Sequence, residues 1–175
     1  MALTPLITMI IIKLAITLVF IFLNAILLRE IVTIFKVKDT SMGTATAIAV
    51  WIGGLLFIFS FISEIKYIGW ISALLLFFFI YFIKWYYDEP WKETILIWEM
   101  WMSILIYLAL FMIAFATNHI PLLLWALIPL AANVAFILFM KFYKNELITH
   151  ILSVIIGFLV INVVSYFLLK AFFPI

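Results

Sequence analysis

The sequence of 175 residues contains no cysteine and no glutamine, and charged residues make up only 10% of it. Without cysteine the chain cannot form a disulfide, a thiolate metal site or a thiol nucleophile. It also lacks the Gly-x-Ser-x-Gly elbow, the His-Glu-x-x-His helix, the P-loop and the Gly-x-Gly-x-x-Gly turn that mark common enzyme classes. We therefore expect that the chain is not by itself an enzyme.

The chain contains more apolar residues than a soluble protein does. They make up 70% of it, against about 45–50% in typical soluble domains. A soluble domain of this length could not bury so much apolar surface. The basic residues are scattered and the net charge is +2, which gives no indication of a nucleic-acid partner. The composition therefore predicts an all-α integral membrane protein.

Six long apolar runs predict about six transmembrane helices, because a helix needs roughly 20 residues to cross the hydrocarbon core. The first run is longer than the core of a signal peptide, so we expect a true span. The connections are short, which favours a single transmembrane domain over residues 1–175, a polytopic bundle arranged as three hairpins. The predicted spans are residues 5–28, 44–63, 67–86, 92–116, 121–140 and 147–169.

Basic residues in short loops predict the orientation, because such loops stay in the cytoplasm. Loops 29–43, 87–91 and 141–146, with the adjoining helix ends, carry seven of the ten basic residues. We therefore predict a multi-pass protein of the cell membrane, with these loops cytoplasmic and both termini outside. Residues 83–89 and 140–146 have similar sequences. Either the hairpins are a true repeat, or Lys and aromatic residues recur wherever a helix reaches the headgroups.

Charged side chains inside a span are costly and therefore informative. Glu99 lies about two turns into the fourth predicted span, where it is either an ion or proton site or the structural partner of a basic residue. The candidate partners are Arg29, Lys84 and Lys141. Lys13 lies about two turns into the first span. Its side chain either extends outward to the headgroups or pairs with Glu64.

Neutral polar residues and helix-breaking residues within the spans are also informative. Asn24, Asn133 and Asn162 lie within spans, where hydrogen bonding between helices is their usual task. Pro129 lies in mid-span and predicts a bend, which is either a packing feature or a hinge beside a cavity. The pair Gly53-Gly54 predicts a close helix contact. The candidate intramembrane polar or ion site consists of Glu99, Asn133, Asn162 and Lys13.

The sequence predicts no cofactor and no metal site. A b-type haem needs two axial ligands at a common depth, and the predicted topology places His119 and His150 on opposite faces of the membrane. Met100 and Met102 are of the type that binds copper(I). However, residues two apart on a helix point about 200° apart, so we expect both to be packing residues.

Two functions are compatible with these features. The first is a non-catalytic accessory or structural subunit of a larger membrane complex, respiratory or otherwise energy-transducing, which includes a multi-subunit membrane enzyme. The sparse polar interior and bulky apolar helix faces favour it. Its partners would be membrane lipids and either other membrane subunits or further copies of itself. The alternative is a small ion or solute channel or transporter, with Glu99, Asn133 and Asn162 along a polar path. Transporter repeats usually carry Gly or Pro breaks at matching positions, and Pro129 has no such counterpart.

Overall fold

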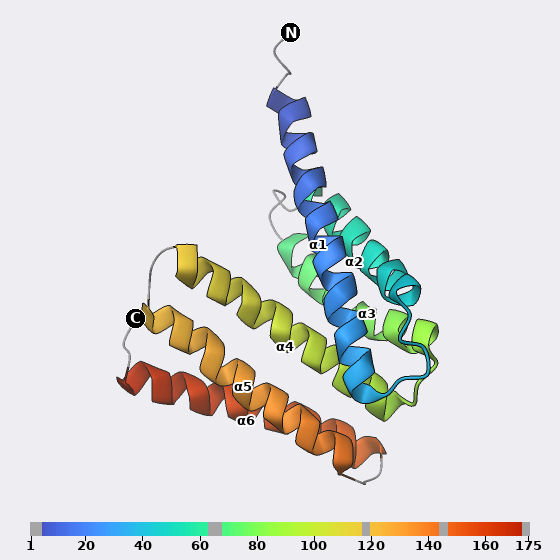
Figure 1. The fold of residues 1–175 in the computed structure, drawn as a ribbon. Coiled ribbons are helices and arrows are strands. Elements are labelled where there is room, and N and C mark those ends of the chain that lie inside the picture. Colours follow the sequence, from blue (N-terminus) through green and yellow to red (C-terminus); the bar gives the residue numbers. More distant parts are fainter. Residues whose placement is uncertain (1–4, 63–67, 117–119, 144–146, 173–175) are drawn as a thin grey trace. The chain divides into compact units, whose positions relative to one another are not determined.

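The computed structural model describes the backbone of residues 5–62, 68–116, 120–143 and 147–172, and the side chains of residues 7–58, 78–108, 110–112, 114–115, 122–143, 149–167 and 170. Over these residues the chain forms six α-helices and no strand (Figure 1). The helices are α1 (Pro5–Phe35), α2 (Met42–Ile62), α3 (Ile68–Tyr87), α4 (Trp91–Ala116), α5 (Ile120–Phe142) and α6 (Leu147–Phe172). The all-α fold predicted from composition is confirmed.

Four helices of the described residues are long and apolar enough to cross a membrane. Their candidate spans are Ile7–Phe35, Trp91–Met112, Leu122–Phe142 and Thr149–Phe167. A shorter apolar stretch covers Met42–Ile58. The protein is therefore an all-α membrane protein, and the number of six crossings stays a prediction. The turn expected at Glu64–Lys66 lies outside the described residues, as do residues 117–119 and 144–146.

The helix bounds follow the predicted spans, with one clear extension. α1 continues as one helix of 31 residues beyond Leu28, to Phe35. The extension is amphipathic, with Ile31, Val32 and Phe35 buried, so packing within the protein supports the added turns. Lys36 follows with φ of 57°, in the left-handed region that ends the helix.

The segment between α1 and α2 is held by two hydrogen-bond acceptors, the Asp39 carboxylate and the Ser41 hydroxyl. Asp39 accepts hydrogen bonds from the backbone N–H of Ser41, at 2.8 Å, and from the Thr44 hydroxyl. The Ser41 hydroxyl accepts a hydrogen bond from the Thr44 N–H at 3.2 Å, which is the usual role of an N-cap serine. These bonds start α2 at Met42, two residues before the predicted start at Thr44.

The same bonds lower the pKa of Asp39 below its ordinary value, with the Thr44 hydroxyl as the main cause and the bonds from Ser41 next. Because the folded-state pKa is depressed, the resulting stabilisation is present above about pH 3.9 and is lost as the pH falls through the folded-state pKa. We expect Thr44→Val to raise the pKa of Asp39 more than Ser41→Ala does. A carboxyl-selective NMR titration of both variants measures this. Equal midpoints in both variants would contradict the assignment.

Contacts divide the helices into two compact units, Met1–Glu89 and Pro90–Ile175, named unit 1 and unit 2. In unit 1, α1 packs along α2, and α2 makes a smaller contact with α3. In unit 2, α5 packs against both α4 and α6, and its contact with α4 is the more extensive. Packing within unit 2 therefore goes beyond the pairing of α5 with α6 expected from three hairpins. The single domain over residues 1–175 stays a prediction.

Two glycines allow the closest helix approaches. A Cβ added at Gly53 would lie 2.2 Å from Cγ1 of Ile21, whereas one added at Gly54 would have nothing within 4 Å. The close contact predicted for this pair therefore belongs to Gly53, between α1 and α2. In unit 2, a Cβ at Gly157 would lie 2.1 Å from Cζ of Phe136, so the Phe136 ring of α5 lies directly over the α6 backbone.

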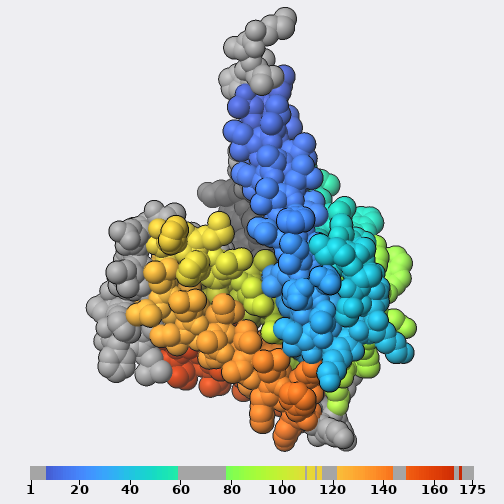
Figure 2. Space-filling model, in the orientation of Figure 1, coloured from blue at the N-terminus to red at the C-terminus, as the bar shows by residue number. Residues whose placement is uncertain are grey.

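The N-terminal end of α1 has few contacts with the described part of unit 1. It extends beyond α2 (Figure 1), and in the space-filling view this blue segment stands clear of the coloured atoms of α2 (Figure 2). Its side chains are mostly large and apolar, and Ile7, Ile11 and Ile12 are each more than 40% exposed. In a membrane such a surface faces lipid tails or another apolar helix, so its exposure carries no penalty.

Candidate functional site

Three polar side chains meet inside unit 2, one from each helix. Tyr107 of α4 donates its hydroxyl hydrogen bond to Oδ1 of Asn162 on α6. The amides of Asn133 on α5 and Asn162 face each other, with each Nδ2 3.4 Å from the other Oδ1. All three residues lie near the middle of their helices, and Tyr107 and Asn133 are buried. We call these three residues the α4–α6 polar cluster.

Each intramembrane asparagine also donates to its own helix. The Nδ2 atoms of Asn24, Asn133 and Asn162 lie 2.8, 2.9 and 2.7 Å from the carbonyl oxygen four residues earlier. For Asn133 that carbonyl belongs to Pro129, and α5 continues as one helix through the proline. These short bonds fix the orientation of the amides. The longer contacts between Asn133 and Asn162 then join α5 to α6.

The hydroxyl of Tyr107 provides a test of the cluster. We expect Tyr107→Phe to destabilise unit 2 by about 0.6 kcal/mol, and by about 1.7 kcal/mol at most, the range of hydrogen bonds between membrane helices. Tyr166→Phe is the matched control, because Tyr166 is an exposed residue that packs edge-to-face on Trp125. Unfolding in mixed detergent micelles measures both. Equal losses for the two variants would show that the Tyr107 hydroxyl bond contributes nothing specific.

Glu99 lies on α4 two turns before Tyr107, at a different position along the helix from the α4–α6 polar cluster. Only 5% of its surface is exposed, and neither carboxylate oxygen has a hydrogen-bond partner among the described residues. Lys141, a predicted partner that lies in the same unit, has its ammonium 5.6 Å from the centre of the Phe142 ring. Glu99 and Lys141 form no ion pair in the described part of the chain. Of the three predicted partners of Glu99, Lys141 is therefore not paired with it within unit 2, and pairing with Arg29 or Lys84 stays a prediction.

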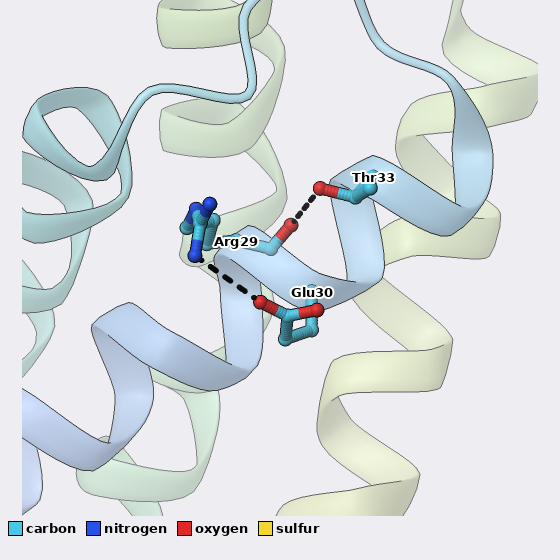
Figure 3. Close-up of polar contacts among 3 residues, drawn as sticks. All are labelled: Arg29, Glu30 and Thr33. Carbon is cyan, nitrogen blue, oxygen red and sulfur yellow. Dashed lines mark hydrogen bonds and ion pairs between the residues drawn. The ribbon is translucent and has the colours of Figure 1, made fainter.

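The other two candidate partners lie in unit 1, each beside an acid of its own helix or helix end. Arg29 Nη1 lies 3.4 Å from Oε1 of Glu30, and the Arg29 carbonyl accepts the Thr33 hydroxyl at 2.8 Å (Figure 3). Lys84 Nζ lies 3.4 Å from Oδ1 of Asp88. Both acids and Arg29 are largely exposed, so these pairs contribute little to stability.

The remaining sequence candidates are Lys13, Glu64, His119 and His150. Lys13 lies on α1 in unit 1, with a half-buried side chain. Its predicted partner Glu64 lies outside the described residues, as does His119. His150 is buried on α6 and interacts electrostatically with Lys92 and Glu93 in the first turn of α4. Among the predicted site residues of unit 2, the structure therefore brings Asn133 and Asn162 together, whereas Glu99 lies elsewhere on α4.

Sequence reasoning missed two residues on α4. Ser103 is fully buried and its hydroxyl has no hydrogen-bond partner among the described residues. Tyr107 completes the polar cluster. The signal was present in the spacing, because residues 99, 103 and 107 follow one another at intervals of four and so share one face of a helix. We call Glu99, Ser103 and Tyr107 the polar face of α4.

A groove beside Tyr107 is apolar. It has a volume of about 220 Å³ and lies between α4 and α5. Its lining residues are Ile104, Tyr107, Leu108, Phe111, Leu127 and Leu130. The Tyr107 hydroxyl is directed to Asn162 on α6, so the groove offers an apolar surface and does not continue the polar cluster.

The fold and these contacts define a class, an all-α membrane protein in which Tyr107, Asn133 and Asn162 bond to one another between three helices. Comparison with protein families, with curated proteins and with solved structures finds no match to this chain.

Proposed function

We propose that the protein is a non-catalytic integral membrane subunit, accessory or structural, of a larger membrane complex. One observation carries the proposal: the intramembrane amides are engaged within the helix packing. Asn24, Asn133 and Asn162 each bond to their own helix at 2.7–2.9 Å, and Asn133 and Asn162 also bridge α5 and α6. A channel or carrier places such groups along a hydrated path. Amides that bond to their own helix and to a neighbouring helix are instead typical of helix packing.

The exposed apolar half of α1 supports a partner within the membrane. Helices associate in lipid through packing and a few polar contacts, and α1 offers a long bulky surface free of its own unit, including Ile16 and Leu18. Other membrane subunits of an energy-transducing assembly are the partners that we propose. For the orientation, we propose that loops 29–43, 87–91 and 141–146 face the cytoplasm and that both termini lie outside, from the distribution of basic residues.

Co-purification tests the proposal. The full chain, carrying an affinity tag, is extracted from its native membrane in a mild detergent and analysed by native electrophoresis and mass spectrometry. We expect one larger species with a fixed ratio of this chain to named membrane subunits. Extraction in a harsh detergent is the control and should release the chain alone. A single homogeneous species containing only this chain in both detergents would overturn the proposal.

A small ion channel or transporter is the second candidate. The observation that favours it is Glu99, a buried carboxyl without a hydrogen-bond partner among the described residues, one turn before Ser103. Purified protein in liposomes separates the two functions. Ion or proton flux that Glu99→Gln abolishes and Glu93→Gln retains supports transport, and no flux above that of empty liposomes excludes it.

A further inference from the structure

The carboxyl of Glu99 is enclosed within the span Trp91–Met112. It lies eight residues after the start of α4, which places it about 12 Å along the helix axis. The side chain is 5% exposed, and both carboxylate oxygens lack a hydrogen-bond partner among the described residues. Buried polar groups in proteins are normally bonded, and each exception requires an explanation.

The described charged groups at this end of unit 2 do not bond to Glu99. From α4 they are Lys92 and Glu93, from α5 Lys141, and from α6 His150. His150 interacts with Lys92 and Glu93, and the Lys141 ammonium lies over the Phe142 ring. Within unit 2, hydrogen bonds from these groups therefore do not stabilise an ionised Glu99.

The closest polar neighbours along the helix are neutral. Ser103 is one turn further on the same face, and its hydroxyl is buried without a hydrogen-bond partner among the described residues. Tyr107 is one turn beyond, and its hydroxyl is bonded to Asn162. The polar face of α4 therefore holds one acid followed by two hydroxyl groups.

The ligand that suits this site is the smallest cation. An isolated carboxylate is costly to bury and becomes neutral by taking up a proton. Calcium takes six to eight oxygen ligands, roughly, and magnesium about six. The described residues contain no group of three or more His, Cys, Asp or Glu that could hold a metal ion. We propose that Glu99 is a proton-binding site whose carboxyl is held as a neutral carboxylic acid at neutral pH within unit 2.

This site goes beyond the proposed function, since a structural subunit needs no protonatable group inside the membrane. The proton site is also tested independently of the proposed function, because the partners found by co-purification do not decide the protonation of Glu99. Glu99→Gln is the appropriate variant, because glutamine has the shape of the neutral acid and carries no charge.

Infrared spectroscopy tests the proposal on the full chain in lipid vesicles at neutral pH. The carbonyl stretch of a protonated carboxylic acid is separate from the bands of carboxylates and is identified by its shift in D₂O. We expect this band in the natural protein, its loss in Glu99→Gln and its retention in Glu93→Gln, the matched change on the same helix. A natural protein without the band, or a band that persists in Glu99→Gln, would overturn the proposal.

A membrane-soluble carbodiimide gives a second, chemical readout. It adds only to a protonated carboxyl: the acid's proton goes to one carbodiimide nitrogen and the carboxyl oxygen bonds to the central carbon. We expect mass spectrometry to find one carbodiimide adduct on the peptide that carries Glu99, at the same yield with and without sodium ions. No adduct at Glu99 would contradict the proposal. Protection by sodium ions would also overturn it, by showing a metal-ion site.

Discussion

Gly53→Ala is expected to destabilise unit 1 by about 1–3 kcal/mol, the usual cost of adding a methyl group to a well-packed contact. The new Cβ would lie 2.2 Å from Cγ1 and 2.8 Å from Cδ1 of Ile21. Either the Ile21 side chain leaves its position or α1 moves away from α2. Both changes reduce the contact between α1 and α2, which is the main one in unit 1.

Gly54→Ala is the matched control. A Cβ at Gly54 has nothing within 4 Å, and alanine is favoured over glycine in a helix by roughly 0.5–1 kcal/mol. The control should therefore be neutral or slightly stabilising. Thermal unfolding of both variants in the same detergent measures the difference. If Gly54→Ala is the more damaging change, the face that α2 presents to α1 has been assigned incorrectly.

Gly157→Ala is expected to destabilise unit 2 by a similar amount, about 1–3 kcal/mol. The added Cβ would lie 2.1 Å from Cζ of Phe136 and within 2.7 Å of both Cε atoms. An aromatic ring is rigid and cannot avoid this clash by turning about its own axis. The ring or the helix must shift, and α5 makes the two most extensive helix contacts of the unit.

A double-mutant cycle separates this clash from a general loss of helix packing. Phe136→Leu alone leaves space over Gly157 and should also destabilise the unit. In the double variant the shorter side chain accommodates the new methyl group, so the two losses should be less than additive by about 0.5–3 kcal/mol, the range for residues in contact. Unfolding of the four proteins under one condition measures the coupling. Additive losses would mean that Phe136 and residue 157 do not meet.

The site was harder to predict than the fold. Glu99 was recognisable in the sequence because an acid among apolar residues at that depth is unusual. Which basic residue pairs with Glu99, if any, depends on side-chain positions, and no spacing along the chain specifies these. Tyr107 and Ser103 could have been found from their four-residue spacing after Glu99. The bond from Tyr107 to Asn162 joins residues 55 positions apart, and their alignment depends on how far α4 and α6 slide along each other.

By itself the sequence determined the class of the protein and the positions of its helices. Apolar runs of about 20 residues can satisfy their backbone groups in lipid only as helices, so the length of each run and the polar loops between the runs, such as residues 29–43, predicted each helix. Only the tertiary structure decided that Gly53 and not Gly54 faces α1, that Asn133 meets Asn162, and that Glu99 lies apart from them. Those outcomes depend on the rotation and axial position of one helix against another, and helix packing determines both.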